Sequence, residues 1–483
     1  MKNFLFDDNN IAANISKILI LAIPFMCVGV CMDNDFWFTI NHGRYILTSG
    51  FTNIEPFTVH EGLALSFEKW LTCISFYKIY DWLGVWGMFW FMMALFAVII
   101  WLFYKGCVLF SGGNKNVSLI ITGFCMSFFG WSYVRTRPQL FSYIFMLLEV
   151  ICLEKYARSG NVRKLWPLPL LSFLYMQFHS TMLPIFYILM LPYLCDLAGV
   201  HALGISGGRY RKLPILIFMG LSMLTPLINP YGVRSFVYLF NSLHDGGLLS
   251  TINEVKRSTA EDLFGCCCPV IVIQVLYVIT RLSRKERFPL RYFFMLCGTF
   301  AMALYAVRNN AFFVLMGGLI CAWEMKYFDL NYGYAVLLKK IAAVTAVIVA
   351  LCICIVPYNI MRSTYAWKVV DDFVKLHPDT NVRMYTDFNC GSYAEWKGIR
   401  CYADPRAEVF LKSVNGKEDI LAEIWDSMHS KLGVTPLQEK YDFDFWLVQM
   451  DYSLDNQLKN SPKYNMLFEN DGYRIYKFLG SDK

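Results

Sequence analysis

The segment from Gly29 to Gly50, "GVCMDNDFWFTINHGRYILTSG", places two acidic residues directly after an apolar run. That run, Ile18–Met32, is apolar enough to begin crossing a membrane. Asp33 and Asp35 stand one residue apart where the run ends, and an aromatic triplet follows them. An acid before a helix is a good N-cap, but two acids beside a bilayer are more than one cap needs. The pair therefore indicates chemistry at the edge of a membrane as well as the start of a helix.

The composition is that of a multi-span membrane protein. Hydrophobic residues make up 56% of the 483-residue chain and charged residues 17%. No small-residue cleavage site follows the first apolar run, so we expect a retained first helix rather than a cleaved signal peptide. A helix needs about 20 mostly apolar residues to cross the hydrocarbon core. On that rule eleven spans are predicted, at residues 15–32, 82–104, 117–134, 139–153, 165–178, 181–199, 213–228, 264–280, 289–307, 311–325 and 337–357.

The distribution of basic residues sets the predicted orientation. With the N-terminus in the cytoplasm, most lysines and arginines of the loops fall on the inner side, as the positive-inside rule requires. The net charge of +7 then reflects topology, and nothing in it indicates binding to nucleic acid. We predict a multi-pass protein of the cell (plasma) membrane whose C-terminus lies outside. One point stays open: the segments flanking His179 form two spans, one long tilted helix or a re-entrant unit.

Two domains are expected. Residues 1–357 are predicted to form a mainly α transmembrane domain with a long first outer loop at 33–81, and residues 358–483 an extracytoplasmic soluble domain. The second part is polar and combines strand-like runs with a helical pattern, which favours a small α/β or α+β fold. Cys390 and Cys401 lie in it, and the sequence leaves open whether they pair. The strands are expected at Val382–Thr386, Phe445–Gln449 and Tyr473–Phe478, and the helix at Val409–His429.

The first outer loop is predicted to carry two interfacial helices. Apolar residues recur at helical spacing from Phe36 to Leu47, Asn41 falls on another face, and Gly50 follows as a C-cap. This pattern is typical of an amphipathic helix lying at the membrane interface. A second such helix is predicted over Glu68–Tyr80, and the "TNIEPFT" between the two reads as a turn. Glu68 also adds a third acid to the pair at the first boundary.

Polar residues gather at the other predicted outer ends of the spans. Taken singly, each is explained as a solvated loop charge. Taken together, they line one face of the membrane with arginines, a histidine and an acid, which indicates a cavity for an anionic, membrane-held ligand. The residues concerned are Arg135, Arg137, His179, Glu254 and Arg308.

Eight short motifs are distributed along nearly the whole chain. In order, they are "DNDFWF" (Asp33–Phe38), "PFT" (Pro56–Thr58), "FEKWL" (Phe67–Leu71), "RPQLFSY" (Arg137–Tyr143), "QFHS" (Gln177–Ser180), "NPYG" (Asn229–Gly232), "CGSY" (Cys390–Tyr393) and "DPR" (Asp404–Arg406). In that order they resemble the GT-C superfamily of membrane glycosyltransferases. They are most similar to a group of bacterial GT-C-like proteins that carry D-P-D-x-W-W after the first span. Asn34 replaces the proline of that motif, Phe67 stands where a histidine is usual, and Lys69 is inserted before Trp70.

The resemblance implies a fold, a reaction and part of a site. GT-C enzymes have a cytoplasmic N-terminus, an acidic motif after the first span, and polyprenyl-phosphate sugars as donors. The resemblance therefore implies an enzyme that moves a sugar from such a donor to an extracytoplasmic acceptor, with inversion at the anomeric carbon. Asp35 matches the acidic position and is the expected catalytic base. Asp33 is expected to orient the acceptor or to share a metal, and Glu68 is the third acid of the catalytic set.

The substrate-binding residues are expected from their chemistry. Transfer needs cations that stabilise the leaving phosphate, and a guanidinium group binds phosphate in bidentate fashion. Arg135, Arg137 and Arg308 are therefore expected at the donor phosphate. His179 is expected to hydrogen-bond the phosphate or the sugar, and Glu254 completes the substrate-binding set.

Two alternatives stay open. The Asp-Asn-Asp sequence also matches the D-x-D of soluble nucleotide-sugar transferases, so a divalent metal is possible, although only two or three oxygen ligands can be named and no cofactor is required. The chain could instead be a non-enzymatic transporter of a lipid-linked glycan, or a binding or assembly scaffold. A transporter should show inverted repeats, and no repeat is visible. The sequence does not identify the sugar, the acceptor or the oligomeric state.

Overall fold

The computed structural model of the protein describes residues 11–28, 32–197, 201–202, 205–243, 256–281, 287–328, 367–470 and 472–480. The chain divides into two compact units. The first, here called the helical unit, comprises Met1–Val30, Phe89–Asn229 and Asn253–Ile360. The second, the sheet unit, comprises Cys31–Met88, Pro230–Ile252 and Met361–Lys483. Each unit is therefore assembled from segments far apart in the sequence.

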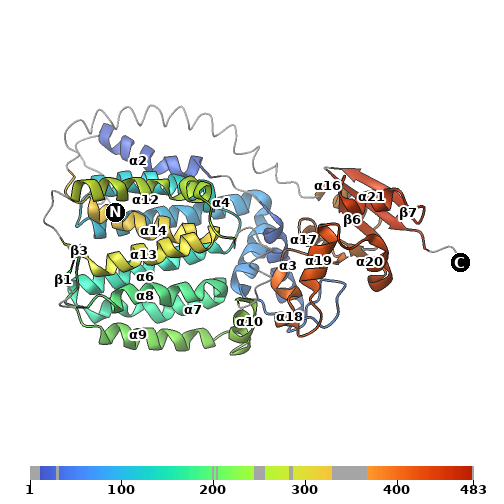
Figure 1. The fold of residues 1–483 in the computed structure, drawn as a ribbon, viewed down its shortest axis with the longest axis horizontal. Helices are drawn as coiled ribbons and strands as arrows, with labels where there is room; N and C mark the ends of the chain where they lie inside the picture. The colour runs from blue at the N-terminus through green and yellow to red at the C-terminus, as the bar shows by residue number, and fades with distance from the viewer. Residues whose placement is uncertain are drawn as a thin grey trace. The chain divides into compact units, whose positions relative to one another are not determined.

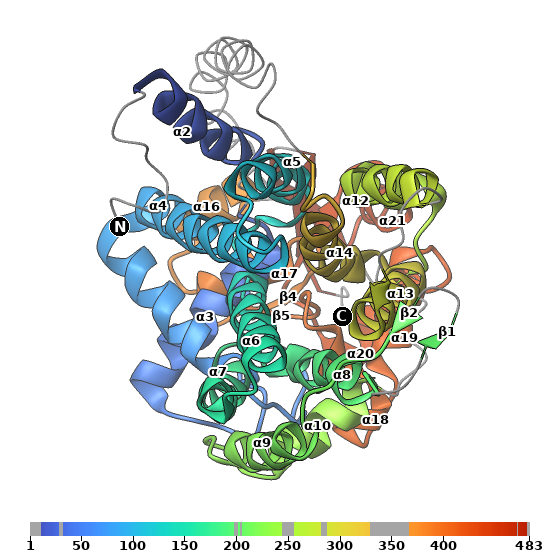
Figure 2. The ribbon, with the colours of Figure 1, turned by 90° about the vertical axis from the view of Figure 1, so that its left-hand side faces the viewer.

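Apolar helices that run alongside one another form the helical unit, and Figure 2 shows them nearly end on (Figure 1). Short 3₁₀ segments and a three-stranded patch of two-residue strands, in the order β1-β2-β3, join their ends. The helices are α2 (Ile11–Met26), the later part of α4 (Trp70–Phe110), α5 (Lys115–Tyr133), α6 (Gln139–Ser159), α7 (Pro167–His179), α8 (Leu183–Leu194), α9 (Leu213–Leu224), α12 (Ala260–Arg281), α13 (Leu290–Tyr305) and α14 (Asn310–Glu324). The connections are η1 (Val162–Leu165), η2 (Ser180–Met182), η3 (Thr225–Leu227), η5 (Val307–Asn309), β1 (His201–Ala202), β2 (Ile205–Ser206) and β3 (Phe288–Pro289).

The predicted helices are present, but the predicted number of membrane spans is not confirmed. A helix occurs at each predicted span within the described residues, whereas the span expected at 337–357 lies outside them. By length and composition, three described segments are long and apolar enough to cross a membrane: Trp70–Phe110, Val162–Leu194 and Ala260–Tyr277. Two further apolar segments, Leu213–Leu227 and Leu290–Tyr305, are shorter.

The segments flanking His179 form a helical hairpin, which excludes one long tilted helix and leaves two spans and a re-entrant unit as predictions. The Ser172 hydroxyl on α7 lies 3.1 Å from the Tyr187 hydroxyl on α8, although the two residues are 15 positions apart. In one straight helix that separation would be about 22 Å, at 1.5 Å per residue. The backbone turns at His179, whose φ of −162° and ψ of 73° are not helical. The two segments are therefore separate helices that fold back on each other.

Glycine allows the first helix to approach α5 closely. A Cβ atom on Gly130 would lie 2.8 Å from the carbonyl oxygen of Pro24, and one on Gly123 would lie 2.7 Å from Ile20. Helices that lack a hydrophobic driving force in lipid associate through such close contacts between small residues. Substitution at either glycine would push α2 away from α5.

Buried charges hold α6, α8 and α13 together. The guanidinium of Arg291 lies 3.0 Å from Glu154 and 3.3 Å from Asp196. The Tyr292 hydroxyl donates to Glu154 at 2.6 Å, and Arg158 donates to the same carboxylate at 2.7 Å. Because both carboxylates are fully buried and each is satisfied, the cluster fixes the packing of these helices.

The sheet unit combines a five-stranded mixed sheet with short helices. The strand order is β5-β4-β6-β8-β7; β4 pairs in parallel with β5 and β6, whereas β8 is antiparallel to β6 and β7. The strands are β4 (Arg383–Tyr385), β5 (Arg400–Cys401), β6 (Phe445–Gln449), β7 (Tyr464–Asn470) and β8 (Tyr473–Phe478). The helices are α3 (Asn34–Ser49), the first part of α4, α10 (Arg234–Leu243), α16 (Trp367–Leu376), α17 (Gly391–Trp396), η6 (Ala407–Phe410), α18 (Lys412–Asn415), α19 (Ile420–Met428), α20 (Val434–Tyr441) and α21 (Ser453–Lys459).

The first loop and the C-terminal segment share one hydrophobic core. The Val59 N–H donates to the Cys401 carbonyl at 2.9 Å, so the loop extends the edge of the sheet beside β5. Side chains of the loop, such as Leu63 and Phe67, belong to the same buried cluster as Tyr402 and Trp446 of the C-terminal segment. Segments that share a core must lie on the same side of a membrane. This agrees with the predicted topology without fixing which side it is.

Several predicted elements are confirmed, and one helix needs correction. Strands β6 and β8 have the predicted bounds, and β4 lies within its predicted range. The single helix expected over Val409–His429 is wrong: the chain forms η6, α18 and α19, because Gly416 takes a left-handed conformation and Asp419 starts a new helix. Cys390 and Cys401 are separate buried thiols.

Helix α3 occurs where predicted and ends at Gly50, but its polar face is not solvated. Asn41, expected on the polar face, is 2% exposed, whereas Leu47, expected on the apolar face, is 44% exposed. The reason is that α17 and the first part of α4 cover α3; a Cβ on Gly43 would lie 2.1 Å from the Cys73 carbonyl oxygen. The second predicted loop helix is the beginning of α4, which Gly84 separates from the later part by a kink with φ 62°.

The shared core makes a topological prediction. Single cysteines introduced at Glu61 in the first loop and at Lys459 in the C-terminal segment, both exposed, should react with a membrane-impermeant maleimide added from the same side of sealed vesicles. A cysteine at exposed Arg163, in the connection between α6 and α7, should react only from the other side, because three helices separate it from the loop. The protein without an added cysteine is the control. Labelling of positions 61 and 459 from opposite sides would contradict the shared core.

Candidate functional site

The two acids at the first boundary have different positions in the structure. Asp33 is the N-cap of α3: its Oδ1 accepts from the Phe36 N–H at 3.3 Å. Asp35 lies in the first turn and therefore favours the positive end of the helix dipole without capping it. Both acids are half-buried, whereas Asn34 and Phe36 beside them are buried. The structural explanation of an N-cap thus accounts for Asp33 alone.

The C-terminal segment holds the start of α3 in place. The Asn34 side-chain amide donates to the carbonyls of Phe388 and Asn389, and the Ser392 hydroxyl donates to the Asn34 carbonyl at 2.8 Å. These partners lie in or beside the "CGSY" stretch, Cys390–Tyr393. Glycine is required there, because a Cβ on Gly391 would lie 1.8 Å from the Ala403 carbonyl oxygen. The position of the two acids is therefore set by residues more than 350 positions away.

Aromatic rings fix the next turn. The Trp37 ring lies 4.7 Å from that of Tyr393 and 4.9 Å from that of Trp367, between ring centroids. Tyr80, on the first part of α4, lies 5.6 Å away on another side. Edge-to-face packing of this kind stabilises one orientation of the helix. A rigid support is what a catalytic carboxylate on α3 would need.

One buried arginine joins the first loop to the C-terminal segment. Arg406 is 1% exposed, and its guanidinium contacts Asp404 at 2.5 and 2.8 Å, Glu55 at 2.9 Å and Glu395 at 3.5 Å. Its Nη1 also donates to His42 Nε2 at 3.1 Å. The cluster thus connects "DPR" of the C-terminal segment with the "EPFT" turn of the loop and with α3.

The charges in this cluster depend on one another. Burial lowers the pKa of Arg406, but Asp404, Glu395 and Glu55 outweigh it and hold the pKa well above its usual value. Burial, and then the Asp404 charge, raise the pKa of Glu395 well above its usual value, so Glu395 keeps its proton. Burial and Arg406 lower the pKa of His42 well below 6.5, which agrees with a neutral ring whose Nε2 accepts. The cluster therefore places one cation among three buried carboxyl groups.

The "EPFT" turn uses its glutamate to order the loop. Glu55 accepts from the N–H groups of Phe57 and Thr58, each at 2.9 Å, and from the Thr58 hydroxyl at 2.7 Å. The same carboxylate also accepts a hydrogen bond from Arg406, so both of its oxygens have partners inside the sheet unit. The turn that the sequence predicted is therefore also an anchor.

Glu68 lies next to a second acid. Its N–H donates to the Ser66 carbonyl at 2.9 Å just before α4 begins, and its Oε1 has no hydrogen-bond partner within the described part of the chain. Burial, and then the nearby Glu408, raise the pKa of Glu68 from 4.5 to about 8, against the opposite effect of Lys69. Burial also raises the pKa of Glu408. A carboxyl group that titrates near neutral pH can accept or donate a proton, so Glu68 stays a candidate acid or base.

In the helical unit, three of the predicted basic residues lie near the start of α6. Arg135 and Arg137 lie in the bend between α5 and α6, where the Arg137 N–H donates to the Arg135 carbonyl at 2.8 Å. His179 ends α7, is 6% exposed, and hydrogen-bonds through Nδ1 to the Ser142 hydroxyl on α6 at 2.7 Å. The end of α7 therefore lies beside the start of α6.

Arg308 belongs to the same end of the helical unit. It lies in η5, directly before α14. The Cys267 thiol donates to the Asn310 carbonyl at 3.8 Å, and the neighbouring Cys266 thiol donates to the Ser132 hydroxyl at 3.3 Å. The start of α14 and the end of α5 thus both lie beside the start of α12, so all four predicted residues lie at one end of the unit.

The structure therefore groups the predicted residues in two sets. Asp33, Asp35 and Glu68 belong to the sheet unit, and the basic residues Arg135, Arg137, Arg308 and His179 to the helical unit. Glu254 lies outside the described residues. Their catalytic and binding roles stay predictions. Within the described ranges, no three His, Cys, Asp or Glu side chains gather as a metal site would require, and a divalent metal stays a prediction.

Sequence reasoning missed most of the buried cluster. The "DPR" stretch was noted as a motif, but nothing linked Arg406 with Glu55, which is 351 positions away, or with His42, which is 364 positions away. Their partnership depends on tertiary structure. The sequence did contain one signal: Glu55 is a charged residue with apolar neighbours on both sides, which indicates that it is buried with a partner.

The chain was compared with known proteins. No protein-family model matches the sequence, and no curated protein matches it either. In structure it is similar to the oligosaccharyltransferase of Archaeoglobus fulgidus in the apo form, with a TM-score of 0.56 and 10% identity over 92% of this chain and 70% of that chain. The same enzyme tethered through a disulfide bond to an acceptor peptide with the NVT sequon gives 0.50 and 9%, over 90% and 69%. At this identity the similarity shows only that the two proteins share a fold.

The buried cluster makes a stability prediction. Arg406→Gln removes the cation and leaves the Asp404 and Glu55 carboxylates buried without a counter-charge, which should cost about 3–5 kcal/mol. Thermal unfolding in detergent should show a large fall in Tm, whereas Lys375→Gln, at an exposed ion pair, should change it little. Adding Asp404→Asn to Arg406→Gln should restore part of the loss. Equally small changes in Tm for Arg406→Gln and Lys375→Gln would show that the Arg406 cluster does not stabilise the fold.

The raised pKa of Glu68 makes a pH prediction. The folded protein keeps a proton on Glu68 up to about pH 8, whereas the unfolded chain loses it near 4.5, so folding stability should fall as the pH rises between these values. Glu68→Gln has no proton to lose. The Tm of this variant minus that of the wild type should therefore increase from pH 5 to pH 9. A difference that is independent of pH would show that Glu68 is not held protonated.

Proposed function

We propose that the chain is a membrane glycosyltransferase that moves a sugar from a polyprenyl-phosphate donor to an acceptor outside the cytoplasm. The observation that carries the proposal is the structural similarity to an oligosaccharyltransferase over 92% of the chain. The order of the eight stretches quoted above supports it independently, because a fold alone does not determine a function. The chain spans 70% of the length of that enzyme, so its substrates need separate identification.

The proposed reaction is a substitution at the anomeric carbon. The acceptor oxygen forms the new bond while the bond between that carbon and the donor phosphate breaks, and polyprenyl phosphate leaves with the bonding electrons. The acceptor proton passes to a carboxylate within about 3 Å. We assign this base to Asp35, because it lies in the first turn of α3 and matches the acidic position that the resemblance implies, whereas Asp33 is the N-cap of that helix. Orienting the acceptor is the role that we propose for Asp33.

The basic residues of the helical unit are proposed to stabilise the leaving phosphate. Arg135, Arg137, His179 and Arg308 lie at one end of that unit, and guanidinium groups stabilise phosphate charge well in a site with little water. The cation at Arg406 is not available for this role, because it is buried and already bound to carboxylates. This contrast separates the arginines that hold the fold from those proposed to bind the donor.

A non-enzymatic role in binding or transporting a lipid-linked glycan is the alternative. It requires the same donor contacts but no base. Asp35 therefore distinguishes the two functions, since binding needs only its charge or hydrogen bonds whereas transfer needs its ability to accept a proton.

Substitution of Asp35 tests the function. Asp35→Asn should leave folding nearly unchanged, because Asp35 does not cap α3 and its dipole contribution is at most about 1 kcal/mol. Transfer from a polyprenyl-phosphate sugar should fall by about a hundredfold or more, because an amide cannot act as a base. The assay compares wild type and variants at matched protein levels, with a panel of acceptors that includes peptides.

Asp33→Asn is the matched control. Asparagine caps a helix about as well as aspartate, so this variant should fold normally, and its transfer rate should exceed that of Asp35→Asn. If both variants keep the wild-type rate, Asp35 is not the base. If wild type and all variants bind the donor but none transfers sugar to any acceptor, the binding function replaces the enzymatic one.

A further inference from the structure

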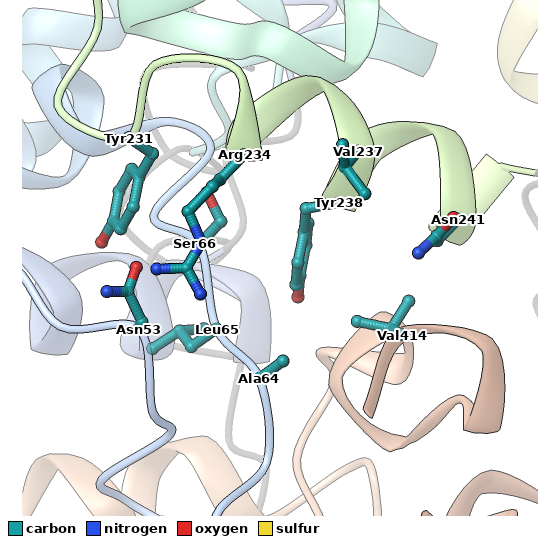
Figure 3. Close-up of a pocket in the computed structure, with 10 residues that line it drawn as sticks. All are labelled: Asn53, Ala64, Leu65, Ser66, Tyr231, Arg234, Val237, Tyr238, Asn241 and Val414. Atoms are coloured by element: carbon teal, nitrogen blue, oxygen red, sulfur yellow. The ribbon is translucent and has the colours of Figure 1, made fainter. Parts of the chain in front are cut away.

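Helix α10 has a polar face on a cavity and an apolar face exposed beside it. Arg234, Tyr238 and Asn241 recur at helical spacing and line the cavity, which has a volume of about 200 Å³. Val233, Val237 and Phe240 recur with the same spacing, one position earlier, and are 64%, 55% and 60% exposed. The remaining lining comes from Val237 of α10, from Tyr231 just before that helix, from the first loop and from α18, all within the sheet unit (Figure 3). The loop contributes Asn53, Ala64, Leu65 and Ser66, and α18 contributes Val414.

Two buried hydroxyl groups lining the cavity lack partners. Tyr238 is 8% exposed and Ser66 is 7% exposed, and within the described part of the chain neither hydroxyl makes a hydrogen bond. Figure 3 shows the Tyr238 hydroxyl pointing from α10 across the cavity. A buried hydroxyl without a partner is destabilising, so most native structures satisfy it with protein, water or ligand. The two groups are thus placed for a hydrogen-bonding ligand.

The charge of the cavity is positive. Arg234 extends into it beside Ser66 and Asn53 (Figure 3), and among the described residues it forms no ion pair. The described residues that line the cavity include no carboxylate. Glu68 and Glu408 lie near Tyr238, and burial raises the pKa of both carboxyl groups, which favours their protonated forms. An anion is therefore the complementary ligand.

The cavity is built on a fixed frame. The Tyr231 hydroxyl donates to the Thr52 carbonyl at 2.9 Å, which ties the segment before α10 to the first loop. The Ser413 hydroxyl donates to the Asn241 carbonyl at 3.4 Å, which ties the far end of the helix to α18. Because both ends of α10 are held, the polar groups keep their positions without a ligand.

We propose that this cavity binds the headgroup of an anionic phospholipid, phosphatidylglycerol, with the acyl chains along Val233, Val237 and Phe240. Arg234 is complementary to the phosphodiester, and the hydroxyls of Tyr238 and Ser66 to the headgroup hydroxyls. The amides of Asn53 and Asn241 add donors and acceptors for the same groups. The exposed apolar face favours a lipid over a soluble phosphate, because an amphipathic helix with such a face lies in the membrane interface. The site goes beyond glycosyl transfer and does not depend on it.

Native mass spectrometry of the full chain in detergent, titrated with dioleoyl phosphatidylglycerol, tests the site. The wild type should bind one lipid more tightly than the rest. Arg234→Gln should weaken that binding about tenfold or more, and Tyr238→Phe at least about threefold, since charged hydrogen bonds are stronger than neutral ones. Phe240→Ser should also weaken it by removing a chain contact.

Controls separate this site from general attraction to charge. Arg209→Gln removes an exposed arginine of the helical unit and should leave the tight site unchanged. Tyr238→Phe removes an unpartnered hydroxyl, so its Tm without lipid should not fall, and it reports on binding rather than folding. Unchanged affinity in both Arg234→Gln and Tyr238→Phe would overturn the proposal. So would equally tight binding of dioleoyl phosphatidylcholine, or of glycerol 3-phosphate, which would show that the charge or the lipid is not recognised.

Discussion

The buried guanidinium of Arg406 is the interaction on which the sheet unit depends. It is bound at once by Asp404 from its own segment, by Glu55 from the first loop, and by His42 from α3. A buried cation is stable only when carboxylates surround it, and the carboxylates are stable only with the cation. Three segments from opposite ends of the chain therefore fold into one unit or leave uncompensated charges in its core.

This constraint determines where the acids of the first boundary lie. Once the loop and the C-terminal segment are joined, the "CGSY" stretch contacts Asn34 and fixes the start of α3. Trp37 then packs among rings from both segments. Asp35 lies in the first turn of this helix, which packs against both segments. The C-terminal part of the chain thus supports the helix that carries the proposed base.

Local patterns predicted local structure well. The strands β6 and β8, the ends of α3 and the turn at Glu55 follow from alternation, capping residues and turn residues, all of which act over a few positions. The burial of Asn41 and the break at Gly416 were not predicted, because the first depends on packing and the second on one backbone conformation. The cluster around Arg406 could not be predicted, since its partners are brought together only by the tertiary fold. The candidate acids and basic residues were predicted from their residue types and from their positions at the ends of apolar segments. Their partners could not be predicted in this way.

The most direct test of the proposed function is a structure of the protein with a bound polyprenyl-phosphate sugar. The account predicts that the anomeric carbon faces the Asp35 carboxylate and that the phosphate contacts at least one of Arg135, Arg137 and Arg308. A donor bound with its phosphate away from these arginines and its sugar away from Asp35 would contradict it.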